Sequence, residues 1–165
     1  MSRYSPGVVE NTERIARFVF SPMFFNAKTG KVKPNIFSHV FSAGCSIQRD
    51  SVAKDKELIN LTNISLSRDS NSSWIGVLLA ECHELRSIKI ESSHNRTVCV
   101  YDTANKENPA HGEIGQTQHI VNPEDIVELR EALFAAFNKG AMTPPSLYRN
   151  GTVWNNLTQP IQARR

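Results

Sequence analysis

Residues 122–139, NPEDIVELREALFAAFNK, give the clearest structural signal in this sequence. Asn122 is a favourable N-cap residue, and Pro123 suits the first helical position. Apolar residues then recur at spacings of three and four along one face: Ile126, Leu129, Leu133 and Phe137. Gly140 follows as a typical C-terminal residue. These features predict a helix over about 123–139 whose apolar face packs against a core.

Shorter segments upstream of this helix are rich in strand formers and often alternate apolar with polar residues. They predict strands over 36–41, 73–77, 87–91, 96–101 and 111–120. Two further helices are expected near 51–61 and 79–86, and residues 13–20 fit either a helix or a strand. We therefore predict an α+β fold in which a mainly antiparallel sheet packs against the C-terminal helix.

The character of the sequence changes after residue 140. Proline and glycine interrupt the remaining stretch, which lacks periodicity but keeps apolar anchors: Leu147, Tyr148, Val153, Trp154 and Leu157. We predict a single α+β domain over 1–140 and an extended C-terminal arm over 141–165. The arm is expected either to wrap its own domain or to bind a protein partner through Leu147, Tyr148, Trp154 and Leu157.

Composition excludes several classes of protein. The 165 residues contain 39% hydrophobic residues and no apolar run near the 20 residues that a membrane-spanning helix needs. Neither a secretory signal nor a disulfide framework is evident, since the three cysteines are scattered. A cytoplasmic protein without membrane contact is expected. The net charge of +3, with its basic excess at the two ends, permits nucleic-acid binding without requiring it.

The most suggestive segment for chemistry is Asn108-Pro-Ala-His-Gly-Glu-Ile114. On a strand, His111 and Glu113 point to the same face, where an imidazole and a carboxylate can share a proton or a ligand. Ala110 and Gly112 leave room for a close neighbour. We predict His111 and Glu113 as catalytic residues. The alternative is a loop-to-strand junction in which His111 only hydrogen-bonds the backbone.

A second candidate is the segment Gly44-Cys-Ser-Ile-Gln-Arg-Asp50. A turn of small residues leads into Ser46, which we add to the catalytic candidates. Arg49 can bind a phosphate through its forked guanidinium, so it is predicted as the phosphate-binding residue. The alternative gives Ser46 a local capping role and makes Arg49 and Asp50 a surface ion pair.

Motifs for cofactors and metals are missing from the sequence. The histidines and cysteines do not follow the spacing of a structural zinc module, and no Walker A, dinucleotide-binding or nucleophile-elbow motif is present. We therefore predict no cofactor and no metal site. Whether the protein is an enzyme stays open at this point.

Several positions resemble, in their order, a group of small bacterial proteins without an established activity. The resemblance covers about residues 14–115 and depends mainly on Asn108-Pro-Ala-His-Gly-Glu113. Weaker matches precede it at Arg17, Ser21-Pro22, Phe24, Gly30, Val32, Phe37 or Phe41, Ser46 and Arg49. This chain departs from the group in the longer stretch after Arg49. The resemblance implies a bacterial origin and a pocket built from these positions, but no reaction.

Three hypotheses for function follow from these features. The first is a small cytoplasmic interaction module in a multi-component bacterial system, such as phage defence or a toxin–antitoxin pair. The second is an enzyme that acts on a nucleotide or nucleic acid, with His111 as general acid or base. The third is sequence-independent binding of nucleic acid. The second hypothesis should be dropped if His111, Glu113, Arg49 and Ser46 do not converge in one pocket.

Overall fold

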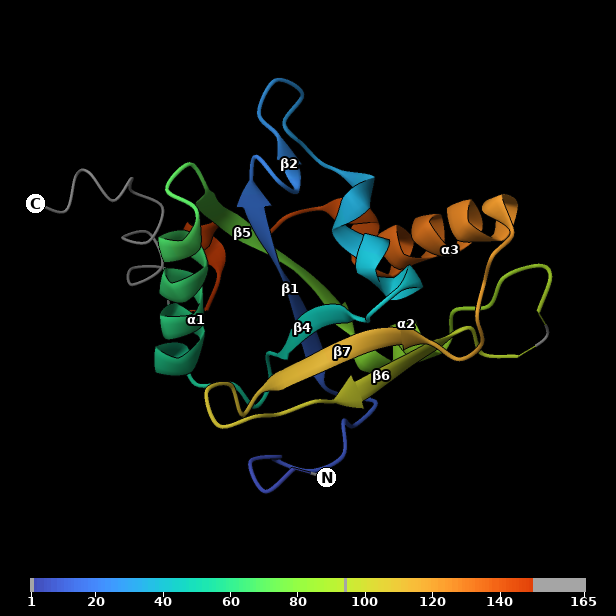
Figure 1. The fold of residues 1–165 in the computed structure, drawn as a ribbon, viewed down its shortest axis with the longest axis horizontal. Helices are drawn as coiled ribbons and strands as arrows, with labels where there is room; N and C mark the ends of the chain where they lie inside the picture. Colours follow the sequence, from blue (N-terminus) through green and yellow to red (C-terminus); the bar gives the residue numbers. More distant parts are fainter. Residues whose placement is uncertain (1, 94, 150–165) are drawn as a thin grey trace, which may run out of the picture.

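The computed structural model describes residues 2–93 and 95–149. Its centre is a five-stranded sheet in the order β5-β1-β4-β7-β6, in which all neighbouring strands are antiparallel (Figure 1). The strands are β1 (Arg14–Ser21), β4 (Cys45–Arg49), β5 (Ser73–Glu81), β6 (Val98–Asp102) and β7 (His111–Gln116). A small hairpin joins β2 (Phe25–Asn26) to β3 (Lys31–Val32).

One face of the sheet carries the main core. It is covered by α3 (Pro123–Ala136), α2 (Cys82–Arg86) and the 3-10 helix η1 (Pro34–Phe41). The Asn122 side chain caps α3 by accepting a hydrogen bond of 3.1 Å from the Glu124 backbone N–H. This packing confirms the predicted α+β class and the C-terminal helix. The helix ends at Ala136, slightly earlier than predicted, and continues as the 3-10 turn η2 (Asn138–Gly140).

Among the described residues, the opposite face of the sheet is covered in part, by α1 (Asp55–Arg68) and the chain that follows η2. Thr143 forms a β-bridge with Val77 of β5, and η3 (Pro145–Leu147) precedes Tyr148. Tyr148 packs in the second core cluster, and its hydroxyl donates to the buried Asp50 carboxylate. The described part of the arm therefore lies against its own domain.

This packing changes the prediction for the arm. Tyr148 is only 1% exposed, so it is not available to a protein partner, whereas Leu147 is 74% exposed. Trp154 and Leu157 lie outside the described residues. Within residues 2–93 and 95–149, no helix combines the length and apolar character that crossing a membrane requires.

Two strand predictions are wrong. Residues 36–41 form η1, because Pro34 favours a helical start and Ile36, Phe37 and Val40 present one buried face with helical spacing. Residues 87–91 are not a strand, although Ile88 and Ile90 are buried, because the backbone N–H of Glu91 bonds to the Glu128 side chain of α3 instead of a neighbouring strand. The helix predicted near 51–61 begins and ends later, as α1.

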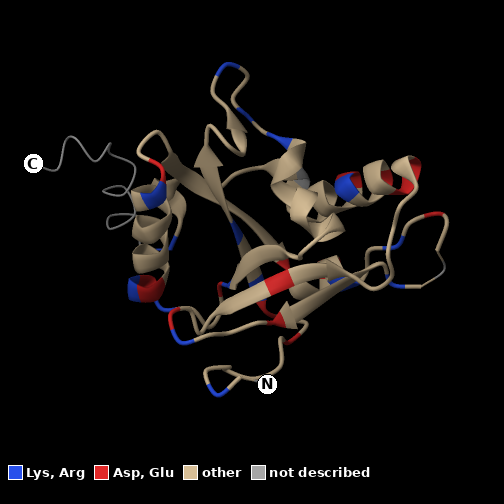
Figure 2. Cartoon of the chain, in the orientation of Figure 1, with Lys and Arg blue, Asp and Glu red and all other residues tan. Residues whose placement is uncertain are grey.

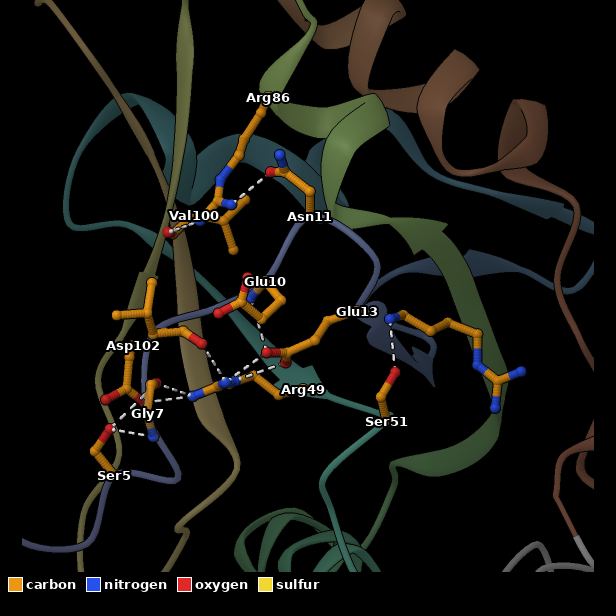
Figure 3. Close-up of polar contacts among 12 residues, drawn as sticks. Ser5, Gly7, Glu10, Asn11, Glu13, Arg49, Ser51, Arg86, Val100 and Asp102 are labelled. Carbon is orange, nitrogen blue, oxygen red and sulfur yellow. Dashed lines mark hydrogen bonds and ion pairs between the residues drawn. The ribbon is translucent and has the colours of Figure 1, made fainter.

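A buried ionic network holds two strands, β4 and β6, and the N-terminal segment before β1 together (Figure 3). The Arg49 guanidinium, at the end of β4, donates to both carboxylate oxygens of Glu13, at 2.8 and 2.6 Å, and to Asp102 of β6 at 3.2 Å. It also donates to the backbone carbonyls of Gly7 and Val8. The five N–H bonds of the guanidinium are thereby matched by acceptors inside the protein.

We predict that Arg49→Ala lowers the free energy of unfolding by about 3–5 kcal/mol, because Glu13 and Asp102 then remain as buried carboxylates without a counter-charge. Urea denaturation measures this change. Arg3→Ala is the control, since Arg3 is exposed and its hydrogen bond is to the adjacent Tyr4; we expect a change within about 0.5 kcal/mol there. Equal losses in both variants would contradict the account of the network.

We also predict that the ionisation of Glu13 makes the free energy of unfolding depend on pH. Burial opposes its ionisation, but hydrogen bonds from Arg49 and from the Glu10 backbone outweigh burial and hold its pKa below the ordinary 4.5. The stabilisation is therefore present above about pH 4.5 and is lost as the pH falls through the lower folded-state pKa. The difference in unfolding free energy between wild type and Glu13→Gln should shrink below pH 4.5. A difference that stays constant would contradict the prediction.

Candidate active site

A cleft of about 430 Å³ lies between α1 and the partly covered face of the sheet. One wall is the α1 face formed by Leu61, Ile64, Ser65 and Arg68, which recur with helical spacing. The other wall comes from the sheet: Ala16, Phe18, Phe20, Ser46, Gln48 and His111. The loop before β7 closes one end with Asn105, Glu107 and Asn108. This volume is in the range of sites for small molecules.

The ladder between β4 and β7 determines which side chains face the cleft. Gln48 pairs with His111, and Ser46 pairs with Glu113. Directly opposed residues of an antiparallel pair point to the same face, and alternate residues point to opposite faces. Ser46, Gln48 and His111 therefore project from the partly covered face, while Ile47 projects into the main core.

His111 forms the centre of a chain of polar side chains. Its Nε2 lies 2.6 Å from Ser46 Oγ, and its Nδ1 lies 2.7 Å from Thr103 Oγ1. With the ring proton on Nδ1, His111 donates to Thr103, and Nε2 accepts the hydroxyl proton of Ser46. Thr103 thereby orients the ring, and Ser46 stands on the cleft side of it.

This arrangement contains two parts of the machinery for nucleophilic catalysis. A serine hydroxyl is a weak nucleophile until a neighbouring base removes its proton, and the base works best when a third group fixes its orientation. Ser46, His111 and Thr103 have these relative positions. Ser46 and His111, each predicted as a catalytic candidate, are thus brought together by the fold, and Thr103 is a residue that the sequence pattern does not reveal.

Glu113 does not lie in this cleft. It shares the sheet face of His111, as predicted, but it lines a second cleft with Gly44, Tyr101 and Gln116. Both ring nitrogens of His111 have hydroxyl partners within hydrogen-bond distance. The expected role of Glu113 as the partner of His111 is therefore wrong for this geometry, and Thr103 occupies that position.

Arg49 also lies away from the cleft. It is 1% exposed, and its donors are used by Glu13, Asp102 and backbone carbonyls. It therefore has no free donor for a phosphate, and the prediction of Arg49 as the phosphate-binding residue does not fit. The four predicted residues do not converge in one pocket, so the hypothesis of an enzyme built on those four residues is dropped. Arg17 and Arg68 are the basic residues among those that line the cleft.

The small residues before Glu113 have a structural role. A side chain at Gly112 would lie 2.6 Å from Ile47 Cδ1 and 2.8 Å from the backbone oxygen of Tyr101. Ala110 packs in the second core cluster, and its carbonyl accepts from the Arg49 backbone N–H at 2.8 Å. The space that these residues leave is thus filled by neighbouring strands, which hold His111 in register.

Cys45 and Cys82 show no sign of a nucleophilic role. Burial raises the pKa of Cys45 and of Cys82, which favours the neutral thiol over the reactive thiolate. Among residues 2–93 and 95–149, His, Cys, Asp and Glu side chains form no group of three or more that could hold a metal ion.

Comparison of the chain with family models, with curated proteins and with solved structures finds no match in any of the three. The geometry of the cleft is therefore the basis for assigning a function.

We predict that Gly112→Ala lowers the free energy of unfolding by about 1–3 kcal/mol, because the added methyl group forces the three strands apart. Gly115→Ala is the matched control on the same strand. Its added carbon lies 3.0 Å from the exposed Tyr101 ring, which can move aside. Chemical denaturation of both variants measures the effect. A larger loss in Gly115→Ala than in Gly112→Ala would contradict this view of the strand packing.

Proposed function

We propose that this protein is an enzyme that acts on a nucleotide or a nucleic acid, through a different set of residues from the four predicted from the sequence. Ser46 is the nucleophile, His111 is the general base and acid, and Thr103 orients His111. The observation that carries the proposal is the chain Ser46–His111–Thr103 at the wall of a cleft. The cleft also contains two arginines, and phosphate-containing substrates are recognised by arginine through paired N–H donors.

The proposed reaction is transfer of a phosphoryl or nucleotidyl group. Ser46 Oγ forms a bond to phosphorus while the bond between phosphorus and the leaving oxygen breaks. The hydroxyl proton passes to His111 Nε2 and then to the leaving oxygen. Water next attacks the phosphorus and gives its proton to Nε2. The bond to Ser46 Oγ breaks, and Oγ recovers the proton from His111, so that the enzyme returns to its starting state.

Two other hypotheses have less support. Sequence-independent binding of nucleic acid calls for a dense basic surface, whereas lysines and arginines are scattered over separate elements of the described chain (Figure 2). A protein-interaction module would bind through the arm, of which Leu147 is the exposed apolar member among the described residues. We keep the bacterial and cytoplasmic setting expected from the sequence as part of the proposal.

We predict that Ser46→Ala and His111→Ala each lower the rate of phosphate-ester cleavage by about 100-fold or more, because each removes a group that takes part in the proton transfer. Thr103→Val should lower the rate by a smaller factor, since it disturbs only the orientation of the His111 ring. The assay is release of product from a panel of nucleoside phosphates, dinucleotides and short single-stranded RNA and DNA.

His119→Ala serves as the control, because this histidine is exposed and lies outside the cleft. It should leave the rate unchanged. Wild-type protein that cleaves no member of the panel, or a His111→Ala variant that retains the full rate while folded, would overturn the proposed function.

A further inference from the structure

Arg17 occupies an unusual place in the sheet. β1 and β4 are joined by two residue pairs, Ile15 with Arg49 and Ala16 with Gln48, and the strands separate beyond them. Arg17 leaves β1 on the η1 side of the sheet, opposite to Ala16 and Phe18, and lines the cleft through the gap. Its guanidinium donates to the Ser46 carbonyl at 2.6 Å and to the Ile36 carbonyl at 3.1 Å. At the edge of the cleft, a charged side chain thus takes the place of the backbone hydrogen bonds between β1 and β4.

This guanidinium has no carboxylate partner among the described residues. Arg14, Arg49 and Arg149 all form ion pairs with aspartate or glutamate, but Arg17 forms none. Its Nε is buried and has no hydrogen-bond partner within residues 2–93 and 95–149, and burial lowers the pKa of Arg17. Holding a largely buried cation without a counter-charge is costly. An anion from outside the protein would remove this cost.

The surroundings of Arg17 narrow the kind of ligand. The Phe24 ring lies on one side of the Arg17 guanidinium. The central carbon of the guanidinium, Cζ, is 5.0 Å from the centre of the ring. Arg68 stands on the opposite wall, at the end of α1, and Glu107 is the one acidic residue among the described residues that line the cleft. The balance of charge therefore favours an anion, and Phe18, Phe20 and Leu61 offer apolar surface for the rest of a ligand.

Asn108 adds a second point of recognition. Its side chain is 4% exposed and lines the cleft, and its Nδ2 donates to Gln48 Oε1 at 2.9 Å. Its Oδ1 has no partner among the described residues. A small rotation of the amide would offer this acceptor to a hydroxyl or amino group of a ligand. The cleft thus combines an anion-binding group with a separate polar contact.

We propose that Arg17 binds the phosphate group of a small, nucleotide-sized ligand in this cleft, next to Ser46. The inference rests on the proposed function, whose substrate class it narrows from nucleotides and nucleic acids to free phosphorylated small molecules. Arg17 lies in a gap between strands rather than on an open surface, which suits a single terminal phosphate better than a continuous nucleic-acid backbone. One of its N–H donors contacts the backbone carbonyl of Ser46, so a phosphate bound by Arg17 would lie close to the residue whose hydroxyl attacks.

The test is a titration with inorganic phosphate, in which binding is monitored through the Nε–H resonance of Arg17 in 1H–15N NMR spectra. The resonance is assigned from its loss in Arg17→Lys. We expect a saturable shift in wild type. Calorimetry on the Ser46→Ala protein, which does not turn over, then compares nucleoside 5′-monophosphates with the matching nucleosides. Monophosphates should bind about tenfold tighter or more.

Two variants separate ligand binding from folding. Arg17→Met should remove the preference for monophosphates, and Arg17→Lys should keep part of it, because lysine retains the charge but not the fork. Circular dichroism checks that each variant is folded. Arg130→Met is the control, since Arg130 lies on α3 against the Phe41 ring and outside the cleft. It should leave both affinities unchanged.

No shift of the Arg17 resonance at millimolar phosphate, or equal affinity for nucleosides and their monophosphates, would overturn the inference. So would an equal response to citrate, which would indicate a carboxylate site, or tighter binding of single-stranded RNA with steep salt dependence. The two proposals fail separately. Phosphate binding at Arg17 without cleavage overturns the enzyme alone, and cleavage without a role for Arg17 overturns the phosphate site alone.

Discussion

The ion pair between Arg49 and Glu13 is the interaction on which the rest of the structure depends. It fixes the face of β4 that turns inward, since a shift of one residue would bring Ser46 into the core and expose Arg49. Asp102 and the carbonyls of the N-terminal segment join the same guanidinium, so β6 and the segment before β1 are tied to β4 as well. With Arg49 directed inward, Ser46 and Gln48 face the cleft, where β7 presents His111.

Two arginines on neighbouring strands have opposite environments, and this difference links the fold to the proposed function. Arg49 is buried and surrounded by carboxylates and carbonyls, which raise its pKa through hydrogen bonds and charge. Arg17 has two carbonyl acceptors, no carboxylate partner in the described part of the chain, and a position at the cleft. The charge of Arg49 is neutralised within the protein and stabilises the fold. The charge of Arg17 is not neutralised among the described residues, and a substrate phosphate beside Ser46 would supply the missing counter-charge.

Much of the fold follows from local patterns, but the site follows only in part. The capped, periodic helix after Asn122 and the shared face of His111 and Glu113 are local properties, so the sequence predicts them. The partners of Arg49 come from 36 and 53 positions away, and no local pattern shows that they neutralise it. Thr103 and Arg17 join the site through strand pairing and strand separation, which depend on the whole sheet. Of the sequence features considered, only the resemblance to the group of small bacterial proteins includes Arg17.

The central claim is that the cleft beside Ser46 is a phosphate site served by Arg17 and a reactive serine oriented through His111. A crystal structure of the Ser46→Ala protein soaked in phosphate tests it most directly. The account predicts density for a phosphate ion whose oxygens accept hydrogen bonds from the Arg17 guanidinium and which lies next to residue 46, with His111 still bonded to Thr103. A cleft without the ion, or a phosphate bound only at exposed lysines elsewhere, would contradict it.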